Sequence, residues 1–208
     1  MHISKIICIL ILGSLAMRSC NFQANTYDST LITDSTQFEI DHKSTEGVKL
    51  IEDNKHFKIT KFNNMYYYDI FDKDNIIVKS DGPFNKQPKI SMIDDHLVKV
   101  TLQAGTGLST QWGYFYDINM DVFSRTFYGI YDVYNEKVAY RVADGIVIRN
   151  IFDKTSYYKE IMSFKSLIAT STEPFVEVRF LNDGKSIKIV YLTGQDFQRV
   201  TEYFDLTE

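Results

Sequence analysis

Short segments in which apolar and polar residues alternate dominate the chain from about residue 48 onward. These segments are rich in Val, Ile, Tyr, Phe and Thr, and Gly, Asn and Asp separate them. Alternation with a period of two residues is typical of strands that bury one face. The expected strands are 56–62, 65–71, 76–80, 89–93, 96–103, 111–118, 122–131, 137–142, 145–152, 175–181, 186–193 and 197–206.

The connections between these segments are mostly of hairpin length, and three of them carry residues that favour tight turns. They are Ile93-Asp94-Asp95-His96, Ala143-Asp144-Gly145 and Leu181-Asn182-Asp183-Gly184. Short connections pair neighbouring strands antiparallel, whereas a parallel sheet needs helix-length crossovers that the pattern does not supply. The sequence therefore predicts an all-β fold: an antiparallel meander or hairpins with little helix, arranged as propeller-like blades or as a β-sandwich.

Two segments also fit a helix. In 157–168 the apolar residues approximate a helical stripe, while the first half fits a strand as well. In 197–206 we expect a strand, because the residues just before it alternate in polarity and 192–196 has the composition of a hairpin turn.

A faint repeat joins an aromatic strand to an acidic or amide turn. It occurs around Asp69, Asp117 and Asn150, and again near Asp205. The first three markers are 48 and 33 residues apart, which brackets the length of a propeller blade, about 40 to 50 residues. A plain antiparallel meander reuses the same turn residues, so the repeat is compatible with both arrangements.

The first nineteen residues have the layout of a secretory signal peptide. Lys5 precedes an apolar run over 6–12, and small residues follow at Gly13, Ser14 and Ala16. The run is shorter than the roughly 20 apolar residues that span a membrane. We therefore exclude residues 1–19 from the fold and expect the protein to be exported.

The cleavage site decides whether the mature protein carries a lipid. Cleavage after Ala16 gives a secreted product without an anchor. Alternatively, Met17-Arg18-Ser19-Cys20 resembles a bacterial lipobox, with Met and Arg where Leu and a small residue are usual. Cys20 is then a lipidation candidate that holds the protein at the cell envelope.

Residues 20–47 are rich in Ser, Thr, Asn and Asp and keep no sustained period, which predicts a polar tether that contributes at most one early strand. A single antiparallel β domain is then expected over residues 48–208. Both cysteines, Cys8 and Cys20, precede that domain. It therefore holds no disulfide and no cysteine-ligated metal.

Charge argues against a nucleic-acid partner. Without residues 1–19 the basic residues fall from 23 to 21 against 27 acidic ones, a net charge of −6. Charges of both signs are interspersed and form no basic block, so the electrostatic footprint of a nucleic-acid binder is missing. We expect membrane contact only through a lipid at Cys20.

Catalytic and metal-ligating patterns single out no enzyme class. Asp94-Asp95-His96 is the densest cluster of metal-ligand types, and its simpler interpretation is a polar turn. Ser156 and Lys159 have the Ser-x-x-Lys spacing of penicillin-binding enzymes without the companion motifs. The carboxylates that lie close in sequence are Asp69 with Asp72 and Asp74, Asp117 with Asp121, and Asp132 with Glu136. No spacing selects one pair, so we predict no catalytic residue, no metal and no cofactor.

Aromatic residues are the feature that favours a function, with 14 Tyr, 15 Phe and one Trp. Strand alternation places Trp112, Tyr114 and Tyr116 on one face, which forms either a binding platform or part of the core. The tyrosines at 66–68, 128, 131 and 134 have the same two interpretations. The loop 104–110, with Thr106 and Ser109, is expected to be a flexible hairpin loop that can rim a binding site.

The sequence thus predicts an exported binding module for a protein, peptide or glycan, acting through a tyrosine-rich sheet face. One alternative is a small extracytoplasmic hydrolase whose carboxylates converge in the fold. Another is a structural accessory subunit whose free sheet edge pairs with a partner strand.

Overall fold

The computed structural model describes residues 47–143, 145–152, 158–162, 164 and 174–207. The chain divides into two units, Met1–Thr36 and Gln37–Glu208, and all described residues belong to the second. The signal peptide, Cys20 and the tether up to residue 46 lie outside the described residues and stay predictions. Among the described residues, no helix is long and apolar enough to cross a membrane.

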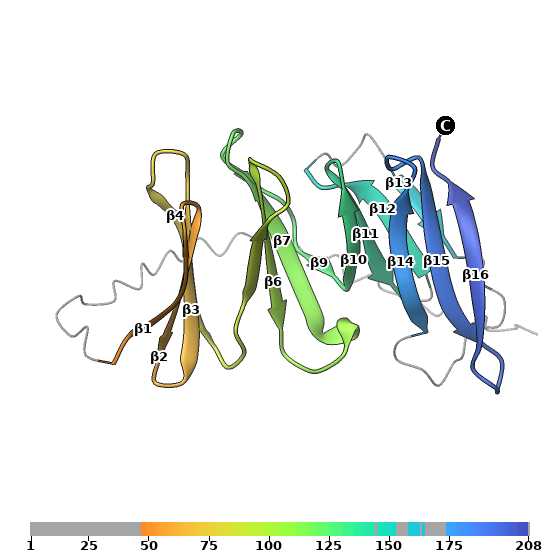
Figure 1. The fold of residues 1–208 in the computed structure, drawn as a ribbon, viewed down its shortest axis with the longest axis horizontal. Coiled ribbons are helices and arrows are strands. Elements are labelled where there is room, and N and C mark those ends of the chain that lie inside the picture. Colours follow the sequence, from red (N-terminus) through yellow and green to blue (C-terminus); the bar gives the residue numbers. More distant parts are fainter. Residues whose placement is uncertain (1–46, 144, 153–157, 163, 165–173, 208) are drawn as a thin grey trace, which may run out of the picture. The chain divides into compact units, whose positions relative to one another are not determined.

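The fold is nearly all β, as predicted, and its strands form antiparallel meander sheets (Figure 1). The strands are β1 (Lys49–Asn54), β2 (Phe57–Phe62), β3 (Met65–Phe71), β4 (Ile77–Phe84), β5 (Lys89–Met92), β6 (Leu97–Gln103), β7 (Gln111–Asp117), β8 (Val122–Phe123), β9 (Phe127–Tyr128), β10 (Ile130–Tyr134), β11 (Lys137–Val142), β12 (Gly145–Asn150), β13 (Tyr158–Ile161), β14 (Phe175–Leu181), β15 (Ser186–Thr193) and β16 (Gln198–Asp205). A single-turn 3₁₀ helix, η1 (Leu108–Thr110), precedes β7.

The strands pair in sequence order within four sheets, which the short turns make possible. The first sheet has the order β1-β2-β3-β4, and the second has the order β5-β6-β7-β8, with β9 also paired to β7. The third sheet has the order β10-β11-β12-β13, and the fourth has β14-β15-β16. Both ambiguous segments contain strands, β13 and β16, so the strand interpretation of 197–206 is confirmed.

One expected strand, 122–131, is wrong, because the chain changes sheets within it. The Ser124 hydroxyl accepts a hydrogen bond from the Phe115 N–H, and the Ser124 N–H donates to the Phe115 carbonyl. These bonds end the pairing of β8 with β7, and Gly129, at φ +61°, turns the chain into β10 of the third sheet. Strand β1 was not expected, because five of its six residues are exposed and its apolar pattern is weak.

Three apolar clusters lie between successive sheets. The first joins β2 and β3 to β6 and β7, the second joins the second sheet to the third, and the third joins the third sheet to the fourth. Strand β7 contributes to two of them, since Tyr114 and Tyr116 face the first sheet while Phe115 faces the third. The two inner sheets are therefore buried on both faces. A sandwich has two sheets, so the four sheets of the described residues do not form a single two-sheet sandwich.

Candidate functional site

The three aromatic residues of β7 share one face, as alternation requires, and that face is part of the core. Tyr114 and Tyr116 are 8% and 0% exposed, and Trp112 is partly buried against the same cluster. Tyr116 stacks on Phe123 with ring centroids 4.6 Å apart and donates a hydrogen bond to Asp121. A ligand cannot reach the rings of Tyr114 and Tyr116, so these two side chains form no exposed platform.

Tyr114 instead completes a buried polar contact between the first two sheets. Its hydroxyl lies 2.6 Å from the hydroxyl of Tyr68, which donates to Asp81 at 3.1 Å. Burial raises the pKa of Tyr68, and the neighbouring Tyr114 and Asp81 raise it further. Burial also raises the pKa of Tyr114, and the Asp81 charge adds to the effect. The two phenols therefore stay neutral and tie β3 to β7.

Trp112 lies at the accessible end of the same face, and the fold places a second aromatic ring beside it. Trp112 is the cross-strand partner of Tyr128 in the β7–β9 pair. Residues directly opposite in an antiparallel pair project on the same face. Tyr128 is 64% exposed, so this pair, unlike Tyr114 and Tyr116, offers an aromatic surface to solvent. Tyr128 was a candidate from the sequence, but its exposure could not be predicted. Strand β9 is only two residues long, too short for alternation to indicate a buried face.

The loop 104–110 leads into β7 one residue before Trp112, and hydrogen bonds within the loop hold its two ends together. The Thr110 N–H and hydroxyl both donate to the Gly107 carbonyl, at 3.1 and 2.7 Å, and the Ala104 N–H donates to the Thr110 carbonyl. The Lys86 ammonium donates to the Gly105 carbonyl. Thr106 is exposed at the tip. Ser109 lies in η1, and its side chain is outside the described structure.

Gly129 fixes Tyr128 against this loop. Its N–H donates to the Gln111 carbonyl, and its carbonyl accepts from the Arg141 N–H, both at 3.0 Å. A Cβ at Gly129 would lie 2.9 Å from the Arg141 Cβ, and φ is +61°. Only glycine fits there without strain. Tyr128 is thus held on a rigid frame next to Trp112 and the loop 104–110.

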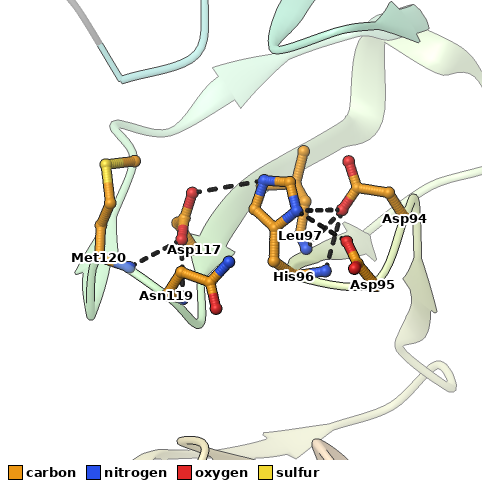
Figure 2. A network of polar contacts seen from close by, with 7 residues as sticks. All are labelled: Asp94, Asp95, His96, Leu97, Asp117, Asn119 and Met120. Atoms are coloured by element: carbon orange, nitrogen blue, oxygen red, sulfur yellow. Dashed lines mark hydrogen bonds and ion pairs between the residues drawn. The ribbon is translucent and has the colours of Figure 1, made fainter.

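A second group of candidate side chains surrounds His96, the residue just before β6 (Figure 2). Its Nδ1 lies 3.0 Å from Asp94 Oδ1 and 3.1 Å from Asp95 Oδ1. Its Nε2 points to Asp117 Oδ2 at 3.7 Å. The β6–β7 register, which pairs Leu97 with Asp117, and a hydrogen bond from the Ile118 N–H to the His96 carbonyl bring the two side chains together.

The carboxylates around His96 have different environments. Asp117 is 2% exposed, and its Oδ1 accepts the N–H groups of Asn119 and Met120, both at 2.8 Å. Asp94 accepts the N–H groups of His96 and Leu97, so it also caps the turn. The hydrogen bond with Asp95 raises the pKa of His96, and the charges of Asp94 and Asp117 act in the same direction. The same hydrogen bond lowers the pKa of Asp95.

Glu136, from the β10–β11 turn of the third sheet, completes this group. Ligand atoms of His96, Asp117 and Glu136 all lie within 4.8 Å of one another, and so do those of Asp94, Asp95 and His96. In the sequence, Asp117 lies close to Asp121, and Asp132 lies close to Glu136. In the structure, Asp121 and Asp132 have other partners. Asp121 accepts a hydrogen bond from the Tyr116 hydroxyl, and Asp132 accepts one from the Phe180 N–H of the fourth sheet at 2.8 Å.

The other sequence candidates have structural partners. Asp69 accepts a hydrogen bond from Ser80, and Asp72 caps the β3–β4 turn through the N–H groups of Asp74 and Ile76. Lys159 lies in β13, and its ammonium donates to the Asp205 carbonyl. Ser156 lies outside the described residues, so the Ser-x-x-Lys spacing is not tested.

Comparisons with known proteins assign no family to the chain. No family model matches it, and no curated protein is similar in sequence. Among solved structures, Kluyveromyces lactis Hsv2 matches 76% of this chain and 73% of its own, with 8% sequence identity and a TM-score of 0.26. A TM-score this low carries no argument about the function.

Proposed function

We propose that this protein is an exported binding module that uses the Trp112–Tyr128 pair and the loop 104–110 to bind a partner. The observation that supports this proposal is Tyr128, 64% exposed on a two-residue strand opposite Trp112. Contact of two neighbouring aromatic rings with water is unfavourable unless a partner covers them, and rigid aromatic residues are favoured binding anchors. The site therefore keeps Trp112 and Thr106 from the sequence prediction and replaces the buried tyrosines with Tyr128.

The partner proposed for this site is a glycan or a peptide. Tyr and Trp rings present an apolar surface with a polar edge, which suits both the apolar face of a sugar ring and a peptide side chain. The exposed Thr106 of the loop 104–110 adds a hydroxyl as a hydrogen-bonding group. The frame around Gly129 is already fixed by hydrogen bonds, so little ordering entropy would be lost on binding.

The chain's single tryptophan makes the site directly observable, because its emission comes only from Trp112. Titration of the full chain with neutral β-linked hexasaccharides and with random heptapeptides is expected to change this emission for one of the two probe classes. Tyr128→Ala should then weaken binding by about 10-fold or more, equal to about 1.4 kcal/mol. Tyr203→Ala is the matched control, because Tyr203 is 66% exposed on β16 of another sheet. Equal affinities for the two variants, or no response to either class, would contradict the proposal.

The alternative of a small hydrolase has one observation in its favour, the approach of Asp117 and Glu136 to His96. A His with a carboxylate on each side can act as a general acid or base. Assays of the full chain with chromogenic ester, glycoside and phosphate substrates, repeated with His96→Ala, would test it. A turnover that His96→Ala abolishes supports the hydrolase, and turnover unchanged by that variant removes His96 from the reaction.

A further inference from the structure

The arrangement around His96 has an unbalanced contact at its centre. Carboxylates cannot donate, so Nδ1 of the imidazole carries the proton of its hydrogen bond with Asp95, and Asp94 Oδ1 lies 3.0 Å from the same nitrogen. The lone pair of a neutral ring is then on Nε2, which faces Asp117 Oδ2 at 3.7 Å (Figure 2). In the protonated ring, which the raised pKa of His96 favours, Nε2 carries a proton instead, and in either form 3.7 Å is too long for a hydrogen bond to Asp117.

The hydrogen bonds of Asp117 leave one of its oxygens available to a ligand. The side chain is 2% exposed, and the N–H groups of Asn119 and Met120 both bond to Oδ1. No residue in the described part of the chain donates a hydrogen bond to Oδ2. Oδ2 faces His96 Nε2 instead, so a cation between these two atoms would have both as ligands.

The distances fit a metal ion. Two ligands of one tetrahedral zinc ion, each about 2.1 Å from it, lie about 3.4 Å apart, close to the 3.7 Å between His96 Nε2 and Asp117 Oδ2. One carboxylate oxygen of Glu136 lies within 4.8 Å of a ligand atom of His96 and of a carboxylate oxygen of Asp117. The backbone of Glu136 is held in place, because its carbonyl accepts the Ile151 N–H at 2.7 Å.

The partners of Nδ1 on the same ring support a metal site. A histidine that binds a metal usually donates its other ring N–H to a carboxylate or carbonyl, which fixes the tautomer and aims the lone pair. Asp95 accepts this hydrogen bond from Nδ1 of His96. Asp94 Oδ1 lies 3.0 Å from the same nitrogen and is held by the N–H groups of His96 and Leu97. The imidazole is therefore oriented toward Asp117 and Glu136 before any ion binds.

We propose that His96, Asp117 and Glu136 form a binding site for a divalent first-row transition metal ion, with zinc as the probe. One imidazole and two carboxylates suit zinc and its neighbours, and four carboxylates around one neutral ring give the site a net negative charge. The ion joins β6 and β7 of the second sheet to the β10–β11 turn of the third sheet. The fourth ligand position is left for water or a partner group.

The test measures zinc and cobalt binding to the metal-free full chain in a Cys8→Ser/Cys20→Ser background, which removes the two thiols as competing ligands. One equivalent of metal is expected to bind, to raise the melting temperature, and to give the ligand-field absorption of four-coordinate Co²⁺. Glu136→Gln should weaken zinc binding by about 10-fold or more and remove the rise in melting temperature. Because Glu136 is exposed in a turn, this variant is expected to fold. His96→Ala should remove the site.

His56→Ala is the matched control, since it deletes another imidazole of the described domain and should leave zinc binding unchanged. Equal zinc affinity and equal stabilisation in the parent, His96→Ala and Glu136→Gln chains would overturn the proposal. Binding lost in His56→Ala and kept in His96→Ala would also overturn it. Trp112 emission, which reports on the aromatic site, separates failure of this proposal from failure of the proposed binding function.

Discussion

At the scale of single residues, the contact between Tyr68 and Tyr114 shows how this protein buries polar groups. Each phenol brings a large ring into the core, and each hydroxyl finds a partner there, either the other phenol or Asp81. Their pKa values are raised mainly by burial, so ionisation is unfavourable in the folded chain. The cost of burying these hydroxyls is offset only while both stay protonated.

This contact predicts a loss of stability in alkaline solution. In the unfolded chain both phenols ionise near pH 10, whereas in the folded chain they hold their protons to higher pH. Their contribution is complete below about pH 10, and above it each buried phenol lowers the free energy of unfolding by about 1.4 kcal/mol per pH unit. Tyr68→Phe should make this fall less steep in denaturant unfolding between about pH 9 and 11.5. Tyr203→Phe, at an exposed position, should leave this fall unchanged. Equal slopes of unfolding free energy against pH in the parent, Tyr68→Phe and Tyr203→Phe chains would contradict this prediction.

At the scale of one element, β7 shows how a strand inside a stack of sheets is used on both faces. Tyr114 and Tyr116 pack toward the first sheet, and Phe115 packs toward the third with 0% exposure. Gly113 lies against the Val100 carbonyl of β6, and a Cβ there would be 2.4 Å from that oxygen. The side chains in the middle of β7 are therefore used for packing between sheets, and its two candidate site residues, Trp112 and Asp117, lie near its ends.

This division predicts that truncating two tyrosines of the same sheet changes the free energy of unfolding by very different amounts. Tyr116→Ala removes a ring that is 0% exposed and is expected to cost about 3–5 kcal/mol of unfolding free energy, the range for large aromatic truncations. Tyr128→Ala removes a ring that is 64% exposed and should change stability by no more than about 0.5 kcal/mol. Urea unfolding followed by far-UV circular dichroism measures both. A large loss for Tyr128→Ala would mean that its ring supports the fold rather than a binding site.

At the scale of the whole molecule, the faint sequence repeat coincides with one structural position. Asp69 lies in β3, Asp117 in β7 and Asn150 in β12, each the third strand of its sheet. The echo at Asp205 lies in β16, the third strand of the fourth sheet. The repeat therefore marks a recurring meander unit, and its irregular spacing reflects unequal connections between units.

Export is the whole-molecule proposal that the sequence supports and the described residues do not address. If Cys20 carries the lipid, the wild-type chain recovered from the native host begins at Cys20 and has the added mass of acyl chains. The Cys20→Ser variant should then leave the membrane fraction. Intact mass of protein recovered from membrane and culture fractions measures both. An unmodified N-terminus at Met17 in the wild type would refute the anchor and direct the search for partners to soluble extracellular molecules.

Much of the fold was predictable, because a period of two residues and short polar turns are local properties. The turns at Asp94-Asp95 and Asn182-Asp183 and strands such as 65–71 and 137–142 follow from such local patterns. The prediction of one strand over 122–131 was wrong, because the apolar residues of this segment continue to alternate while the chain crosses from one sheet to the next. That crossing depends on the hydrogen bonds between Ser124 and Phe115, one in each direction, which are not visible in the pattern.

The sequence by itself determined the all-β class, the antiparallel pairing and the shared face of Trp112, Tyr114 and Tyr116, since each depends on the backbone period and on turn residues. Only the tertiary structure decided which face of β7 is covered, because burial depends on the sheet that packs against it. It alone brought Glu136 to His96 and Asp117, and exposed Tyr128 beside Trp112. Side chains from different sheets meet through packing over long sequence separations, and no local pattern encodes those distances.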